Sequence, residues 1–268
     1  RAFEWGFWAY GFGLVTLLMA FGTGRKWVAW VGAAFLALAI AMHSFGFISR
    51  CLIAERFAIQ NQFESMTGLS LFAVLVATVI MVARRQWLFG AAACAVGFLV
   101  LITATQTAIP GKSIEREAAI LNTSVLLKYH VTTVLASYGL ILLGFVGSLF
   151  FLGVHYAARL GRAQASPAGG GMEIALGAAR GSIATRDKLL HDLDSAQMIL
   201  LQLAFWTLGV GILLGAWWAD HSWGRWWAFD PKETWALITW IVYLIVIHVR
   251  IGIPAKKGLV TAWLSVVG

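Results

Sequence analysis

Residues 217–240 read WWADHSWGRWWAFDPKETWALITW, and this segment joins two long apolar stretches of the chain. It contains seven of the 14 tryptophans of the 268-residue protein, and we call it the tryptophan-rich segment. The flanking stretches, residues 197–218 and 232–249, match the roughly 20 apolar residues that a helix needs to cross a bilayer core of about 30 Å. The segment therefore predicts two membrane helices joined by an unusually aromatic loop.

The same apolar character extends along the whole chain. Hydrophobic residues make up 60% and charged residues 12% of the sequence, and the mean hydropathy is +0.80, which excludes a water-soluble domain of this length. Further candidate spans lie at residues 5–22, 27–47, 66–83, 87–105 and 130–157, and an eighth begins near Gly258 but is too short to cross. We therefore predict an all-α polytopic membrane protein of about eight helices, the last of them incomplete. Since the chain begins with Arg1 rather than methionine, we expect both ends to be truncated.

Three regions follow from this pattern. Residues 1–157 form the first membrane helices and include an outer segment at 49–65, and residues 197–268 carry the tryptophan-rich segment. Between them, residues 158–196 are rich in alanine and glycine, and residues 166–171 read SPAGGG. Such a composition is typical of a flexible linker, which the alternation of spans places in the cytoplasm.

Basic residues predict the orientation of the helices. If the spans alternate, most of them fall on one side, which the positive-inside rule assigns to the cytoplasm. The tryptophan-rich segment is then on the periplasmic side of a bacterial inner membrane or, alternatively, on the lumenal side of a thylakoid. The net charge of +8 mostly reflects this topology, so it does not indicate a nucleic-acid partner. The residues concerned are Arg25, Lys26, Arg84, Arg85, Arg159, Arg162, Arg180, Arg186, Lys188, Arg250, Lys256 and Lys257.

The tryptophan-rich segment has two interpretations. Asp230 as N-cap, Pro231 at the first helical position and Glu233 in a capping box predict the start of the helix that follows. In one interpretation these residues only begin a helix and the tryptophans form an interfacial belt. Belts usually place one or two aromatic residues at a helix end, however. The density of this segment favours a surface for a flat, apolar, conjugated ligand, for which haem is the leading candidate.

Two histidines are candidate ligands for haem iron, which neutral imidazole binds. His130 lies at the outer entry of its span, and His248 follows Pro231 by 17 residues, which is about 25 Å of helix. One haem would not reach both, so they predict an outer site and an inner site. The alternatives are a solvated interfacial histidine at position 130 and a core histidine, bonded to a neighbouring helix, at position 248. His43, His155, His191 and His221 have no motif that marks them as ligands.

Several motifs together resemble one family. Residues 223–240 are similar to the "WWD" segment of the CcsA/ResC family of system II cytochrome c biogenesis, in which a run DPKETW is typical. NQFES at residues 61–65, YHV at 129–131 and IHVR at 247–250 are further matches, so the resemblance covers nearly the whole chain. Phe229 departs from the family pattern, which usually has tryptophan before the aspartate. Phenylalanine keeps a stacking face but lacks the indole N–H.

The resemblance implies a function for these residues. Proteins of this family are thought to carry haem b outward and to present it for covalent attachment to the C-x-x-C-H motif of apocytochrome c. The resemblance implies a synthase or lyase activity that needs two partners. One is a CcsB/ResB-type companion, which supplies the second ligand of the inner haem, and the other is a thiol-reducing pathway. In the family a second outer histidine follows the last helix, beyond the end of this chain. The implied haem-binding residues are His130 and His248 on iron, with Trp223, Gly224, Trp226, Trp227, Phe229, Asp230 and Trp235 around the outer haem.

Other chemistries fit the sequence less well. Cys51 and Cys94 do not form a C-x-x-C pair, which argues against a dithiol oxidoreductase and against a thiolate metal cluster. Two alternatives stay open at this stage: a transporter of haem or another amphipathic solute that performs no attachment, and a b-type electron-transfer cytochrome.

Arg225 is placed to pair with a haem propionate, a hypothesis that rests on its charge and its location.

Overall fold

The computed structural model describes residues 1–114, 124–164, 172–253 and 257–267, except for the side chains of residues 158–164 and 172–184. All regular structure in these residues is helical, which confirms the predicted fold class. Seven helices are long and apolar enough to cross a membrane, whereas α9 has 11 residues and is too short. The helices are α1 (Ala2–Thr23), α2 (Lys26–Ala54), α3 (Gln62–Arg84), α4 (Trp87–Gln106), α6 (Val125–Gln164), α7 (Met172–Trp223), α8 (Pro231–Gly252) and α9 (Lys257–Val267).

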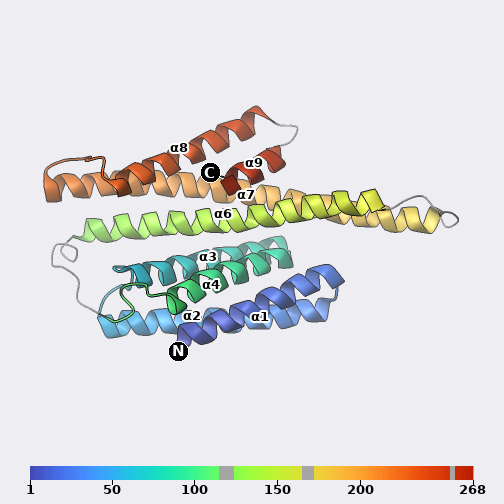
Figure 1. Ribbon diagram of the computed structural model, residues 1–268, viewed down its shortest axis with the longest axis horizontal. Helices are drawn as coiled ribbons and strands as arrows, with labels where there is room; N and C mark the ends of the chain where they lie inside the picture. The colour runs from blue at the N-terminus through green and yellow to red at the C-terminus, as the bar shows by residue number, and fades with distance from the viewer. Residues whose placement is uncertain (115–123, 165–171, 254–256, 268) are drawn as a thin grey trace.

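The helices run back and forth between two ends of the molecule (Figure 1). The carboxyl-terminal ends of α1, α3, α6 and α8 lie at one end, which we call the basic end because Arg25, Lys26, Arg84 and Arg85 are there. The carboxyl-terminal ends of α2, α4 and α7 lie at the opposite end, which we call the tryptophan end. This alternation agrees with the predicted topology. The compartment that each end faces stays a prediction.

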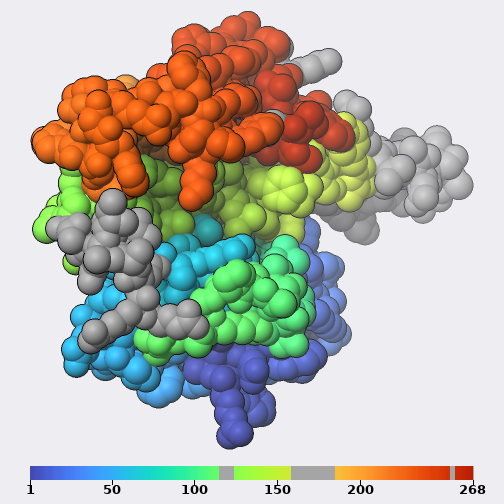
Figure 2. All heavy atoms as spheres, turned by 60° about the vertical axis from the view of Figure 1, so that its left-hand side comes forward, coloured from blue at the N-terminus to red at the C-terminus, as the bar shows by residue number. Residues whose placement is uncertain are grey.

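The helices form two groups, α1–α4 and α6–α9, with α6 between the first group and the rest of the second (Figures 1 and 2). Contacts of α3 and α4 with α6 join the groups. One apolar core extends through both and includes Tyr10, Leu101, Leu143 and Leu200, all at most 4% exposed. The group α6–α9 carries the tryptophan-rich segment and both candidate ligands.

The predicted linker is largely helical. Helix α6 continues to Gln164 and α7 begins at Met172, so only residues 165–171 of the predicted segment 158–196 lie outside the described residues. Alanine is the strongest helix former, so an alanine-rich stretch next to a membrane helix can extend that helix. The described part of 158–196 is therefore helical, whether it is flexible stays untested, and residues 166–171 are not among the described residues. The division into three regions stays a prediction.

A buried ionic cluster shapes the outer segment at residues 49–65. Glu64 is fully buried, and its carboxylate accepts from Arg50 Nε at 3.0 Å and from Arg56 at 2.8 Å. Arg50 also donates to the carbonyl oxygens of Gly111, Lys112 and Ser113. The cluster thereby ties the end of α2 and the start of α3 to the chain that follows α4.

Candidate functional site

The tryptophan-rich segment begins where α7 ends. Gly224 adopts a left-handed conformation (φ 68°), and its N–H donates to the carbonyl oxygen of Asp220 at 2.8 Å. Such a residue ends a helix, and glycine adopts this conformation without the penalty of a side chain. Gly224 therefore turns the chain away from α7 and into the aromatic loop, which accounts for a glycine at this predicted site position.

Two acidic side chains fix the other end of the loop. The Asp230 carboxylate accepts from the N–H of Glu233 at 2.8 Å, which confirms the predicted N-cap of α8. Glu233 differs from the predicted capping box, because its carboxylate accepts from the N–H of Ala228 at 2.7 Å. It therefore reaches past the N-cap residue and holds the loop two residues earlier. Both acids orient the loop between residues 228 and 233.

Phe229 lies between Ala228 and Asp230, which these hydrogen bonds hold, and its backbone conformation is strained. Its φ is 57°, in the left-handed region that a bulky residue rarely adopts, and its side chain is 76% exposed. Such strain costs about 1–3 kcal/mol and tends to gather at functional sites. The surrounding hydrogen bonds thus hold an aromatic ring out from the surface, where burial does not compensate for the strain.

Most of the aromatic surface around Phe229 is open. Trp223, Trp226 and Trp235 are 58%, 56% and 66% exposed. Trp227 meets Phe229 edge to face, with ring centroids 6.1 Å apart. Trp240 differs, since it stacks on Phe205 at 4.9 Å and donates to the carbonyl oxygen of that residue. The predicted ligand surface is therefore the outer part of the segment, and Trp240 packs α8 against α7.

His130 lies against α7 just before this surface. Its Nδ1 is 2.8 Å from the carbonyl oxygen of Gly211. A carbonyl oxygen only accepts, so Nδ1 carries the proton and Nε2 keeps its lone pair in the neutral ring. A metal-bound histidine usually donates its other ring N–H in this way. Among the described residues Nε2 has no hydrogen-bond partner, so its lone pair is not used there.

Gly215 makes room for this imidazole and Gly211 accepts its hydrogen bond, and the sequence reasoning missed both residues. A β-carbon at Gly215 would lie 2.5 Å from Cε1 of His130, so the ring requires glycine there. Gly211 supplies the accepting carbonyl, and the two residues form a G-x-x-x-G pattern, which is typical of close helix packing in membranes. This G-x-x-x-G pattern is the sequence signal from which the close packing at Gly211 and Gly215 could have been predicted. Because Gly215 precedes Trp217 by two residues, His130 lies beside the start of the tryptophan-rich segment.

His248 lies on the exposed side of α8, near the basic end. Its Nδ1 is 2.8 Å from the carbonyl oxygen of Leu244, one turn earlier, so Nδ1 again donates, and Nε2 has no hydrogen-bond partner in the described part of the chain. Helix α8 is continuous from Pro231 to Gly252, which keeps His248 about 25 Å along the axis from the loop. The structure does not bring His130 and His248 together, as expected for two separate sites.

Of the other described histidines, His155 is half-buried and stacks on Phe151 with ring centroids 6.2 Å apart, and the remaining three fall into two groups. His43 is fully buried and uses both ring nitrogens, because Nε2 donates to the carbonyl oxygen of Thr67 at 3.0 Å and Nδ1 pairs with the Tyr10 hydroxyl at 3.2 Å. It is therefore not available as an iron ligand. His191 and His221 are exposed, and His221 donates to the carbonyl oxygen of Trp217 at 3.0 Å at the end of α7.

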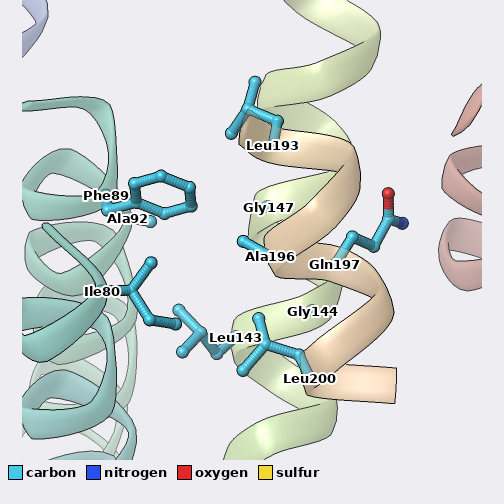
Figure 3. A pocket seen from close by; sticks show the side chains of 10 residues that line it. All are labelled: Ile80, Phe89, Ala92, Leu143, Gly144, Gly147, Leu193, Ala196, Gln197 and Leu200. Atoms are coloured by element: carbon cyan, nitrogen blue, oxygen red, sulfur yellow. The ribbon is translucent and has the colours of Figure 1, made fainter. Parts of the chain in front are cut away.

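A gap between the two helix groups is lined by apolar side chains such as Ile80, Phe89 and Leu200 (Figure 3), but it is too narrow for a porphyrin. Gln197 points out of this gap, toward Ser148 and Ser265. The candidate sites are the surfaces at His130, which is half-buried, and at His248, which is exposed. Arg225 is exposed beside the outer one and has no ion-pair partner among the described residues.

Comparison with known proteins agrees with these features. Residues 3–268 match the family described as cytochrome C assembly protein. The chain belongs to this family. The predicted resemblance to the CcsA/ResC proteins is confirmed, and this family member takes part in cytochrome c biogenesis.

Individual relatives carry the same name. A protein of Gloeobacter violaceus named cytochrome c biogenesis protein CcsA is 27% identical over 97% of this chain and 86% of its own length. A CcsA of Cyanidium caldarium is 31% identical over 76% of this chain and 72% of its own. A CcsA of Cuscuta reflexa is 40% identical over 31% of this chain and 30% of its own length.

Proposed function

We propose that the protein moves haem b across the membrane between two sites and presents it for covalent attachment to apocytochrome c. The observation that carries the proposal is the exposed aromatic surface at the tryptophan end, near an imidazole whose Nε2 makes no hydrogen bond with any described residue. Trp223, Trp226 and Phe229 would hold the porphyrin face, and His130 would bind its iron. Arg225 would pair with a propionate at the rim of this surface.

In the proposed reaction each cysteine thiol of a C-x-x-C-H motif adds across a haem vinyl group. A sulfur–carbon bond forms at one vinyl carbon and the thiol proton goes to the other, so the addition needs no external oxidant. The protein contributes positioning, which turns an encounter of separate groups into one held geometry. Because free thiols are required, a thiol-reducing pathway would supply the reduced apocytochrome.

The inner site would use His248, whose exposed position leaves one side of the iron for a ligand from another chain. We propose a CcsB/ResB-type membrane protein as that companion, and synthase activity only in the complex. The basic end would face the cytoplasm of a bacterial inner membrane, or the equivalent side of a thylakoid, and the tryptophan end the periplasm or lumen.

Co-expression with the companion and an apocytochrome bearing C-x-x-C-H tests the proposal. Haem staining of the apocytochrome on a denaturing gel reports covalent attachment, and we expect His130→Ala to abolish it. His191→Ala is the matched control, since it removes an exposed histidine outside both sites. Full attachment in His130→Ala would contradict the proposed outer site.

The same experiment separates the alternatives. Haem bound by the complex without staining of the apocytochrome would indicate a transporter. A stable b-type spectrum that apocytochrome does not change would indicate electron transfer.

A further inference from the structure

Arg250 is buried, although its place near the end of α8 suggested an ordinary cytoplasmic charge. Its side chain is 8% exposed and donates through both terminal nitrogens to the two carboxylate oxygens of Asp194, at 2.6 and 2.9 Å. It also donates to the hydroxyl of Thr261 at 3.0 Å. A basic residue that only obeyed the positive-inside rule would point into water, so this one has a further role.

The contacts of Arg250 join three helices at the basic end. Asp194 belongs to α7 and Thr261 to α9, and Thr261 donates in turn to the carbonyl oxygen of Lys257 at 2.7 Å. A β-carbon at Gly258 would lie 2.8 Å from the Asp194 carboxylate, so only glycine at this position lets α9 lie this close to α7. The planar guanidinium paired with both oxygens of a carboxylate allows one orientation, which a point charge would not impose.

The rest of α8 makes few buried contacts. Its buried residues are Tyr243, Val246 and Arg250, which lie on one side of the helix. Since an α-helix has 3.6 residues per turn, Arg250 and His248 are about 200° apart around the axis. Directing Arg250 toward α7 and α9 therefore directs His248 to the opposite side. Ile241 and Ile245 are 41% and 53% exposed on that same side.

We propose that Asp194 and Arg250 are positioning residues for His248: their ion pair fixes the rotation of α8 so that this imidazole faces outward. The inference rests on the proposed inner haem site for its functional consequence. It does not depend on that site for the rotation itself. Loss of the Asp194 charge leaves a buried guanidinium without a counter-ion, and Arg250 then turns toward the aqueous boundary and rotates α8 with it.

The rotation can be measured in the membrane-embedded complex with the companion protein. Cys51 and Cys94 are replaced by alanine, and single cysteines at positions 245, 247, 248 and 249 carry a nitroxide label whose oxygen accessibility is recorded. In the parent we expect maxima at 245 and 248. In Asp194→Asn we expect the maxima to move or flatten, and in the exchanged pair Asp194→Arg with Arg250→Asp to return. Arg250→Lys keeps the positive charge but cannot pair with both carboxylate oxygens through a planar group, so it should give an intermediate accessibility pattern.

Haem retained by the purified complex with native His248 is the second measurement. Loss of a group that supports a metal ligand typically lowers metal affinity by about 10–100-fold, so we expect inner-site haem to fall at least about tenfold in Asp194→Asn. His248→Ala defines the level without an inner site. If it retains parental haem, the proposed inner site fails, whatever the labels show. Unchanged accessibility maxima in Asp194→Asn would overturn the positioning role. Full haem retention in Asp194→Asn would also overturn it, provided that His248→Ala loses haem.

Discussion

The imidazole of His130 lies between a carbonyl and a glycine of the neighbouring helix: Nδ1 is 2.8 Å from the oxygen of Gly211, and Gly215 faces Cε1. One contact fixes the tautomer and the other fixes the distance between α6 and α7. As the proposed haem ligand, His130 would need little reorganisation when iron binds.

Gly215→Ala tests this relationship without touching the histidine. The added methyl group would push the ring out of its place, and overpacking of this kind costs about 1–3 kcal/mol. We expect severalfold less covalent attachment, measured by haem staining, with normal membrane insertion. Gly153→Ala on α6 is the control, because a β-carbon there meets no atom within 4 Å. Equal attachment in both variants would show that the position of the His130 ring against Gly215 does not matter for attachment.

His130→Gly tests whether iron ligation is what the residue contributes. Removal of the whole side chain leaves space beside α7, and external imidazole can fill that space and offer the same nitrogen. We expect no attachment in His130→Gly or His130→Ala, and recovery with added imidazole in the glycine variant. The Soret band of the purified complex should recover in parallel. Recovery of attachment without any spectral change would argue against ligation by this group.

Phe229→Gly separates backbone strain from ligand binding. Glycine adopts a positive φ freely, so the folded protein should keep its thermal stability or gain about 1 kcal/mol. Loss of the ring should at the same time weaken haem retention at the outer surface. Phe229→Trp keeps the strain and restores the indole of the usual family residue, so it should retain haem. A glycine variant with full haem retention would remove Phe229 from the site.

Glu64→Gln should destabilise the tryptophan end. The carboxylate is buried between Arg50 and Arg56, and removal of one partner from a buried ion pair costs about 3–5 kcal/mol. We expect a clearly lower midpoint of thermal unfolding in lipid nanodiscs. Glu4→Gln is the matched control, because Glu4 is an exposed acidic residue of α1 and should contribute nothing measurable. Equal midpoints for the two variants would contradict the role given to Glu64.

The sequence was sufficient for features that depend on local pattern. Apolar length located all seven spans, and the order Asp230-Pro231 located the start of α8, because both signals lie within one stretch of chain. The bonds of His130 to Gly211 and of Arg250 to Asp194 join residues 81 and 56 positions apart, and no local pattern specifies which helices meet. The helical part of residues 158–196 was missed because alanine and glycine together do not decide between helix and linker.

The separation of the two proposed haem sites yields the last prediction. Trp223→Ala, Trp227→Ala and Asp230→Ala change the outer surface directly or release the start of α8, whereas His248 lies about 25 Å along that helix. Attachment to apocytochrome should therefore fall in each variant, while haem bound through His248 stays near the parental amount. Haem content measured in the His130→Ala background isolates the inner fraction. Equal losses of inner haem in these variants and in His248→Ala would mean that one extended site, and not two, holds the porphyrin.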